Sequence, residues 1–477
     1  MFKRMWSPCL LRPLLFGCLF ALASVRAADP PPPGNDDWQY DIIYRKQGKP
    51  IKGMILEEKP TQIKLLSIFR KPGAATVVME DTILRAEIDH VDRLSDEDRA
   101  ALDQRIKALR HDREVLAAQL RLLDPTAKVK KTVDVVNLQP ADWPADPTIK
   151  AVQYQSTYFK LVSNAKEEVV QLAAIQLEQV YAAYARALPP RTTDFEPTTI
   201  VLTRSLEDYN TLVRDQGANL VNPAFYDNAK NQVVCGSDLE RLGVDLESLH
   251  KRHVALSAEL SEREKELRQV YKGTIPPEIK GPVDDAARKL LAADEHNNAA
   301  FKKAQQRLFQ RLYHEAFHAY IATAVYPRSD GEVPRWLNEG LAQIFETAIF
   351  EAGELRVGHV DPDRLRAVRP SLKKIELLSL ADLLRAGPKQ FQVGHANDKQ
   401  GSDQHYLTSW ALAFYLTFDR KILGKKALDD YMQSLQRGTD PLDAFRELVG
   451  VPLPKFENDF HQYILRLQTD GTLAARE

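Results

Sequence analysis

Apolar residues along the chain first follow the spacing of strands and then that of helices. Between residues 38 and 94, five short runs rich in β-branched and aromatic residues are separated by Gly48, Pro60 and Pro72-Gly73, which is typical of strands joined by turns. The runs are Tyr40–Tyr44, Ile51–Leu56, Gln62–Ile68, Thr76–Met79 and Arg85–Ile88. Five strands in so short a segment predict a small β-barrel over 38–94 as an N-terminal module.

Helical spacing begins at Ser95. Leucine and isoleucine then recur every three or four residues, which predicts a helix over 95–123 within a helical connector that spans 95–147. Residues 164–188 show a second long amphipathic pattern, which ends at Pro189-Pro190 and predicts another helix.

A segment with a different repeat occupies residues 238–304. Leucines recur with alternating spacings of three and four in its first half, and Gly273 and Pro276-Pro277 then break the pattern. A second helical run follows, so the segment predicts an inserted hairpin of two helices, which we call the arm. His253 and His296 lie on the arm, and we expect polar or solvated histidines there rather than metal ligands. The arm or the β module could bind a protein partner.

Two short β runs, Thr198–Leu202 and Val233–Cys235, predict a small mixed sheet beside the helices. The second run precedes the arm, and we expect it to form an edge strand to which an extended peptide could add. If residues 1–27 are removed, Cys235 is the remaining cysteine, which excludes an intramolecular disulfide in that form. We expect a buried, inert thiol at this position.

The most specific pattern for chemistry is HEAFH at residues 314–318, within a helical run over 305–324. Residues four apart lie on one face of a helix, so His314 and His318 can present two imidazoles to a single metal ion. Glu315 lies one step round from His314, where it can reach a water on that metal without being a ligand.

Glu339 extends this pattern from a second helical run, 336–350, in the sequence WLNEGLA. Its carboxylate completes a set of two histidines and one glutamate with the fourth position open, which is typical of a catalytic zinc site with one ion per chain. A different explanation is that the histidines only complete the packing of an amphipathic helix, and that Glu339 is an acid favoured at a helix start. The combined pattern favours the zinc site.

These two segments together resemble the gluzincin clan of metallopeptidases, whose third ligand is a glutamate on a second helix. WLNEGLA is similar to the aminopeptidase branch, and residues 154–467 as a whole resemble the bacterial peptidase MA-like families. The resemblance implies that His314, His318 and Glu339 bind Zn²⁺ and that Glu315 is the general base. It also implies a mostly helical, thermolysin-like domain with a small mixed β-sheet.

The same resemblance implies a hydrogen-bond donor for the oxyanion from a later helix. Tyr406, in the run QHYLTSWA, is the residue that we predict for this role, with His405 as the alternative. Two features depart from related enzymes. No GxMEN-like exopeptidase signature precedes the motif, and Gln343 stands where some gluzincins have a second acid four residues after Glu339. Aminopeptidase activity is therefore not implied.

The resulting prediction is an α+β protein with an SH3-like β-barrel, a helical connector and a gluzincin-like peptidase domain over 148–470. We expect an enzyme that hydrolyses peptide bonds in a peptide or protein substrate. A zinc amidase acting on cell-wall material and a non-catalytic binding or scaffold protein that retains the fold are the alternatives. Glu315 argues against a scaffold, because a structural zinc site needs no base beside its ligands.

Composition and charge exclude some other classes of protein. Of the 477 residues, 44% are hydrophobic and 27% are charged, as in ordinary globular proteins. The formal net charge of −1 provides no overall field that would attract nucleic acid or anionic lipid. We therefore expect no nucleic-acid partner.

The N-terminal residues predict export. A basic start precedes a mostly apolar run, 10–22, and Val25-Arg26-Ala27 resembles a signal-peptidase site, so we expect a signal peptide over 1–27. The apolar run is short for a membrane span, and we expect no stable insertion after cleavage. A Pro-rich linker over 28–37 would then begin a periplasmic or secreted protein. An alternative is lipoprotein processing at Cys18, although apolar residues continue past it.

Overall fold

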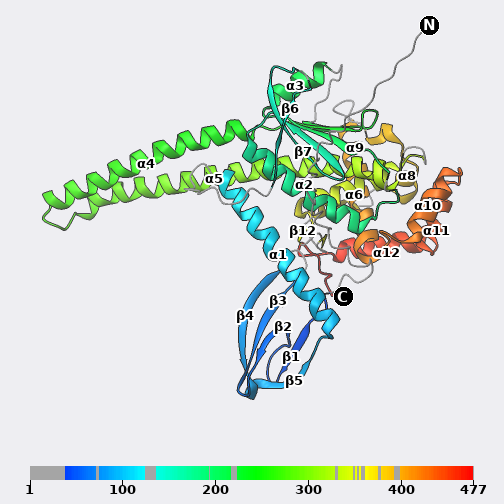
Figure 1. Cartoon of the computed structure of the whole chain (residues 1–477), viewed down its shortest axis with the longest axis horizontal. Helices are drawn as coiled ribbons and strands as arrows, with labels where there is room; N and C mark the ends of the chain where they lie inside the picture. Colours follow the sequence, from blue (N-terminus) through cyan, green and yellow to red (C-terminus); the bar gives the residue numbers. More distant parts are fainter. Residues whose placement is uncertain are drawn as a thin grey trace, which may run out of the picture. The chain divides into compact units, whose positions relative to one another are not determined.

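The computed structural model describes most of the chain after residue 37. The described residues are 38–70, 75–123, 136–144, 146–192, 194–215, 223–327, 331–347, 350–351, 354–355, 360–373, 378–391 and 398–475. They form a mixed α+β structure in which helices predominate (Figure 1). None of these helices combines the length and the apolar character that crossing a membrane requires. The predicted signal peptide and Pro-rich linker lie outside the described residues.

The N-terminal module is an antiparallel sheet with the strand order β4-β3-β2-β1-β5. Its elements are β1 (Asp41–Arg45), β2 (Ile51–Glu58), β3 (Gln62–Phe69), β4 (Val77–Leu84), a 3-10 turn (Arg85–Glu87) and β5 (Ile88–Asp92). Four of the five predicted strands are therefore confirmed, whereas the run predicted as the fifth, Arg85–Ile88, is mostly a 3-10 turn that precedes β5. Within the described part of the module the outer strands β4 and β5 do not pair, so the sheet is open and the predicted barrel closure is wrong.

Helix α1 (Asp96–Leu123) covers one face of the sheet. Its residues Leu102, Ile106 and Leu109 pack against Trp38 and Met54 in one buried cluster. The opposite face buries a separate apolar cluster that the strands form among themselves, so both faces of the open sheet are covered.

A six-stranded mixed sheet lies beside the remaining helices, in the order β10-β11-β9-β8-β7-β6. Its strands are β6 (Gln139–Asp142), β7 (Lys150–Gln155), β8 (Phe159–Ser163), β9 (Thr198–Leu202), β10 (Ala224–Asp227) and β11 (Gln232–Cys235). Strand β9 runs parallel to both β8 and β11, and the other neighbours are antiparallel.

Two predictions about this sheet are wrong. Strand β11, expected at the edge, is interior because it pairs with both β9 and β10, and β10 forms that edge. The connector predicted to be helical over 95–147 also contains β6, which joins the sheet by pairing with β7. The sequence of β6 (QPAD) carries no strand-like pattern, and that of β10 (AFYD) has two strand-favouring aromatic residues but is only four residues long, so their backbone pairing identifies them.

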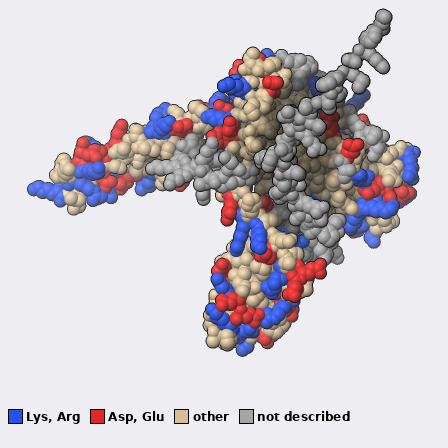
Figure 2. Space-filling model, in the orientation of Figure 1, with Lys and Arg blue, Asp and Glu red and all other residues tan. Residues whose placement is uncertain are grey.

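The predicted arm is confirmed as a hairpin of two helices, α4 (Leu239–Val270) and α5 (Pro277–Tyr320), which lie side by side (Figure 1). One continuous helix α5 forms the second half of the arm and also carries the HEAFH motif. His253 pairs with Asp294 across the hairpin, as expected for a polar residue at the contact between the helices. Figure 2 shows charges of both signs mixed along the arm, and several form ion pairs between neighbouring turns.

Helices α2 (Glu167–Ala187), α5, α6 (Arg335–Thr347) and α9 (Asp398–Phe414) contribute to the largest buried cluster. A Cβ at Gly340 of α6 would lie 2.4 Å from the carbonyl oxygen of Ser409 of α9, so the close approach of these helices requires glycine. The remaining elements are α3 (Leu206–Asp215), a π-helical turn (Ile321–Val325), β12 (Phe350–Glu351), β13 (Glu354–Leu355), α7 (Pro362–Lys373), α8 (Leu380–Arg385), a 3-10 turn (Pro388–Phe391), a second π-helical turn (Tyr415–Asp419), α10 (Lys426–Gln436), α11 (Pro441–Val449) and α12 (Leu453–Arg466).

Candidate metal centre

The packing of α5 against α6 brings His314, His318 and Glu339 together. Nε2 of His314 lies 3.3 Å from Oε2 of Glu339, and Nε2 of His318 lies 3.6 Å from Oε1. One potential ligand atom from each residue lies within 4.8 Å of the other two. These three residues, which the sequence singled out as ligands, could therefore hold a metal ion.

The second ring nitrogen of each histidine is held by a neighbouring side chain. Nδ1 of His314 lies 2.7 Å from Oε2 of Glu346, and Arg364 of α7 binds the other oxygen of that carboxylate. Nδ1 of His318 lies 2.9 Å from Oδ1 of Asn338. These contacts orient both Nε2 atoms toward the glutamate of the cluster and leave those nitrogens for a metal.

Glu339 is almost completely buried, with 1% of its side chain exposed. Burial by itself would raise its pKa, but the electrostatic interaction with His318, the hydrogen bond and charge of His314, and the charge of Arg335 lower that pKa to about 2. The carboxylate is therefore ionised near neutral pH. Its Oε1 forms an ion pair with Arg335, whose Nη2 lies 2.7 Å away, but no described residue donates a hydrogen bond to this oxygen. A buried, ionised oxygen with unused lone pairs suits a cation.

The two imidazoles differ in the charge that they favour. Burial lowers the pKa of His318, which leaves the neutral form that a metal requires. Burial also opposes a charge on His314, but its contacts with Glu339 and Glu346 raise its pKa well above the usual value. The surroundings of His314 thus favour a positive charge, and a metal cation would compete with a proton for that position.

Glu315 and Tyr406 lie close to the cluster. Glu315 is half-buried and forms no hydrogen bond or ion pair with another residue in the described ranges, and its charge acts on both His318 and Tyr406. The Tyr406 hydroxyl donates to the carbonyl oxygen of Phe391 at 3.3 Å. Burial and the charge of Glu339 raise the pKa of Tyr406 to about 12, so the phenol remains a donor near neutral pH.

Gln343 connects the ligand helix to the helix of Tyr406. Its amide nitrogen lies 3.1 Å from the carbonyl oxygen of Glu339 and 3.1 Å from that of Tyr406. Gln343 therefore ties α6 to α9 by hydrogen bonds and does not orient a histidine. His405, the alternative oxyanion donor, packs edge-on against the ring of Phe391.

Sequence analysis did not identify four residues around the cluster, namely Arg335, Asn338, Glu346 and Arg364. Three of them lie on α6 at spacings that could have indicated them, since Glu346 is two turns beyond Glu339 and Arg335 is about one turn before it. Arg364 comes from α7 and carries no local signal. The acid that orients His314 thus lies about one turn after Gln343 on α6.

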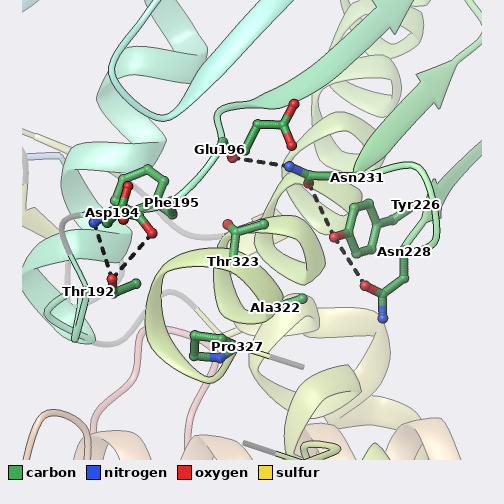
Figure 3. A pocket seen from close by; sticks show the side chains of 10 residues that line it. All are labelled: Thr192, Asp194, Phe195, Glu196, Tyr226, Asn228, Asn231, Ala322, Thr323 and Pro327. Atoms are coloured by element: carbon green, nitrogen blue, oxygen red, sulfur yellow. Dashed lines mark hydrogen bonds between the residues drawn. The ribbon is translucent and has the colours of Figure 1, made fainter. Parts of the chain in front are cut away.

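A pocket of about 360 Å³ lies at the turn that follows α5 (Figure 3). Its lining residues are Thr192, Asp194, Phe195, Glu196, Tyr226, Asn228, Asn231, Ala322, Thr323 and Pro327. Asn231 holds its walls together, because Oδ1 accepts hydrogen bonds from Thr198 and Tyr226 and Nδ2 donates to the Glu196 carbonyl oxygen. Residues of the edge strand β10 and of the turn that follows the motif helix therefore line the same pocket.

A comparison with protein families matches residues 310–443 to the family described as "Protein of unknown function (DUF1570)". The matched segment contains the three candidate ligands, Glu315 and Tyr406. No curated protein matches the chain. The family description specifies no reaction, so the function has to be argued from the side chains.

Proposed function

We propose that this protein is an exported zinc-dependent metallopeptidase of gluzincin type. The observation that carries the proposal is the convergence of His314, His318 and Glu339 from two packed helices, with Glu315 beside them. Contacts of α5 with β9, β10 and β11 support a thermolysin-like arrangement, in which the motif helix lies against a mixed sheet.

Two imidazoles and one carboxylate are a donor set that suits Zn²⁺ with an open fourth position. Zinc bound there would polarise a scissile carbonyl group and make water acidic enough to attack near neutral pH. The residues around the ligands support this role. Glu346 and Asn338 hold the imidazoles in the orientation that ligation needs, and Arg364 holds Glu346.

Glu315 carries out the proton transfers of the reaction. Its half-buried carboxylate takes a proton from the attacking water and passes that proton to the leaving amine. Tyr406, which stays protonated near neutral pH, donates a hydrogen bond to the oxyanion of the tetrahedral intermediate.

The peptide substrate binds at the edge of the six-stranded sheet. An extended peptide adds to β10 by main-chain hydrogen bonds, and the pocket beside that strand accepts one of its side chains. The position of β10 at the edge supports placing the substrate along β10 instead of β11. The hydrogen bond from the Gly236 N–H to the Pro223 carbonyl shows that Phe225 bonds to β11, whereas the main chain of Ala224 faces the free edge. An Ala224→Pro substitution in β10 would remove a main-chain donor at that edge and should raise KM for peptides.

Zinc content and peptide hydrolysis together test the proposal. We expect about one zinc per chain in the wild type and in Glu315→Gln, and cleavage of a mixed peptide library by the wild type alone. Glu262→Gln, an exposed arm position, is the matched control and should cleave normally. Absence of zinc from reconstituted wild type would refute the ligand set, whereas zinc without cleavage would favour a scaffold or a zinc amidase.

Export is a separate part of the proposal. Cleavage after Ala27 or Ala28 predicts that the N-terminal sequence of the protein recovered outside the cytoplasm begins just before the Pro-rich run. A lipid-modified Cys18 at the mature N-terminus would overturn signal-peptidase processing in favour of lipoprotein anchoring.

A further inference from the structure

Arg335 brings a partly exposed positive charge to the candidate metal centre. It is the first residue of α6, and 40% of its side chain is exposed. Nη2 lies 2.7 Å from Oε1 of Glu339, and the guanidinium is within hydrogen-bonding reach of the Tyr406 hydroxyl. Arg335 therefore stands beside a candidate metal ligand and beside the proposed oxyanion donor.

These contacts do not use all the donors of Arg335. A guanidinium carries five N–H groups in a planar fork that matches the two oxygens of a carboxylate. The Nε of Arg335 is buried and has no hydrogen-bond partner among the described residues. Burial keeps this Nε from an incoming ligand, but 40% of the Arg335 side chain is exposed, so the donors that a ligand can reach are the other N–H groups of the guanidinium.

The charges around the cluster point to the same conclusion. In the described part of the chain, Glu339 is the acid that pairs with Arg335, whereas the nearby Arg364 is matched by both Glu346 and Asp361. A divalent cation bound to Glu339 would neutralise that carboxylate. The charge of Arg335 would then be available to an anion that enters the site.

We propose that Arg335 binds a carboxylate of the substrate next to the scissile bond. This inference rests on the proposed peptidase function and narrows its substrate class. The carboxylate has two sources with the same chemistry, the C-terminal α-carboxylate of a peptide and an aspartate or glutamate side chain. In both cases the guanidinium makes charge-assisted hydrogen bonds that a neutral peptide cannot make.

Binding without turnover is the first test, in full-length zinc-loaded protein. Glu315→Gln is titrated calorimetrically with a peptide that has a free C-terminus, with its C-terminal amide, and with amidated peptides that contain either glutamate or glutamine. We expect one carboxylate peptide to bind about 10- to 100-fold more tightly than its neutral counterpart. That preference should disappear when Arg335→Gln is added. Whichever pair shows the difference identifies the source of the carboxylate.

Two controls separate recognition from structural damage. Arg335→Lys should retain part of the preference, because it keeps the charge but loses the planar fork. Arg366→Gln removes an arginine with 77% of its side chain exposed and should leave the preference unchanged. Equal binding of charged and neutral peptides, or an equal loss for both in Arg335→Gln, would overturn the proposal.

Cleavage by the wild type distinguishes this inference from the proposed function. Cleavage with no preference for peptides that carry a carboxylate near the cleaved bond would overturn the role of Arg335 and leave the peptidase intact. If the wild type cleaves no peptide, the proposed function fails, and the binding titrations still decide whether Arg335 recognises a carboxylate.

Discussion

Replacing Glu346 by glutamine tests whether the acid that holds His314 supports metal binding. The substitution keeps the size of the side chain and removes its charge. Oε2 of Glu346 lies 2.7 Å from Nδ1 of His314, and only 15% of the Glu346 side chain is exposed. Solvent therefore screens this pair much less than an exposed ion pair, which would contribute about 0–1 kcal/mol.

A charge-assisted hydrogen bond in such surroundings contributes about 1.5–3 kcal/mol. Loss of an outer partner of a metal-bound histidine typically lowers metal affinity about 10- to 100-fold, which corresponds to about 1.4–2.8 kcal/mol. The two ranges agree. We therefore expect Glu346→Gln to bind zinc about 10- to 100-fold more weakly near pH 8.

The same carboxylate also raises the pKa of His314, so its loss weakens the competition between a proton and the metal. The wild type should lose apparent zinc affinity as the pH falls through the raised pKa of His314. Glu346→Gln should lose less over that range. The gap between the two proteins should therefore narrow from pH 8 to pH 6.

Competition with a chromophoric chelator at both pH values measures these affinities. Asp361→Asn is the matched control, because Asp361 also pairs with Arg364 but is bonded to neither His314 nor His318. Thermal unfolding of the metal-free proteins shows whether either variant is misfolded. If Glu346→Gln binds zinc as tightly as Asp361→Asn at pH 8, the assignment of Glu346 as the partner of His314 is refuted.

Three further changes address the rest of the site. Tyr406→Phe should lower kcat about 10²- to 10³-fold with little effect on KM. The loss should be the same from pH 6 to 9, because a pKa of about 12 keeps the phenol protonated over that range, and an unchanged kcat would exclude Tyr406 as the oxyanion donor. Asn338→Ala should weaken zinc binding only about fivefold in a chelator titration, since its hydrogen bond is neutral, and a loss as large as that of Glu346→Gln would contradict this ranking. Gly340→Ala should lower the free energy of unfolding in urea by about 1–3 kcal/mol, because the added Cβ would meet the Ser409 carbonyl oxygen. Unchanged stability would show that α6 and α9 can move apart at no cost.

Features that depend on local geometry could be predicted from the amino-acid sequence alone. His314 and His318 are four residues apart, and a helix places such residues on one face whatever surrounds it. Four strands of the N-terminal module and the two helices of the arm were also predictable, because their apolar residues recur with a period that identifies the element. Glu339 was found through its resemblance to a known ligand segment.

How these elements pack against one another could not be predicted in this way. The partnership of Glu346 with Arg364, the contact of Arg335 with Tyr406 and the position of β10 at the sheet edge join segments from different elements. Local periodicity states which face of an element is apolar, but not which neighbour covers it. Helix packing and strand pairing make that choice, and for this reason α1 covers an open sheet where the strand pattern predicted a closed barrel.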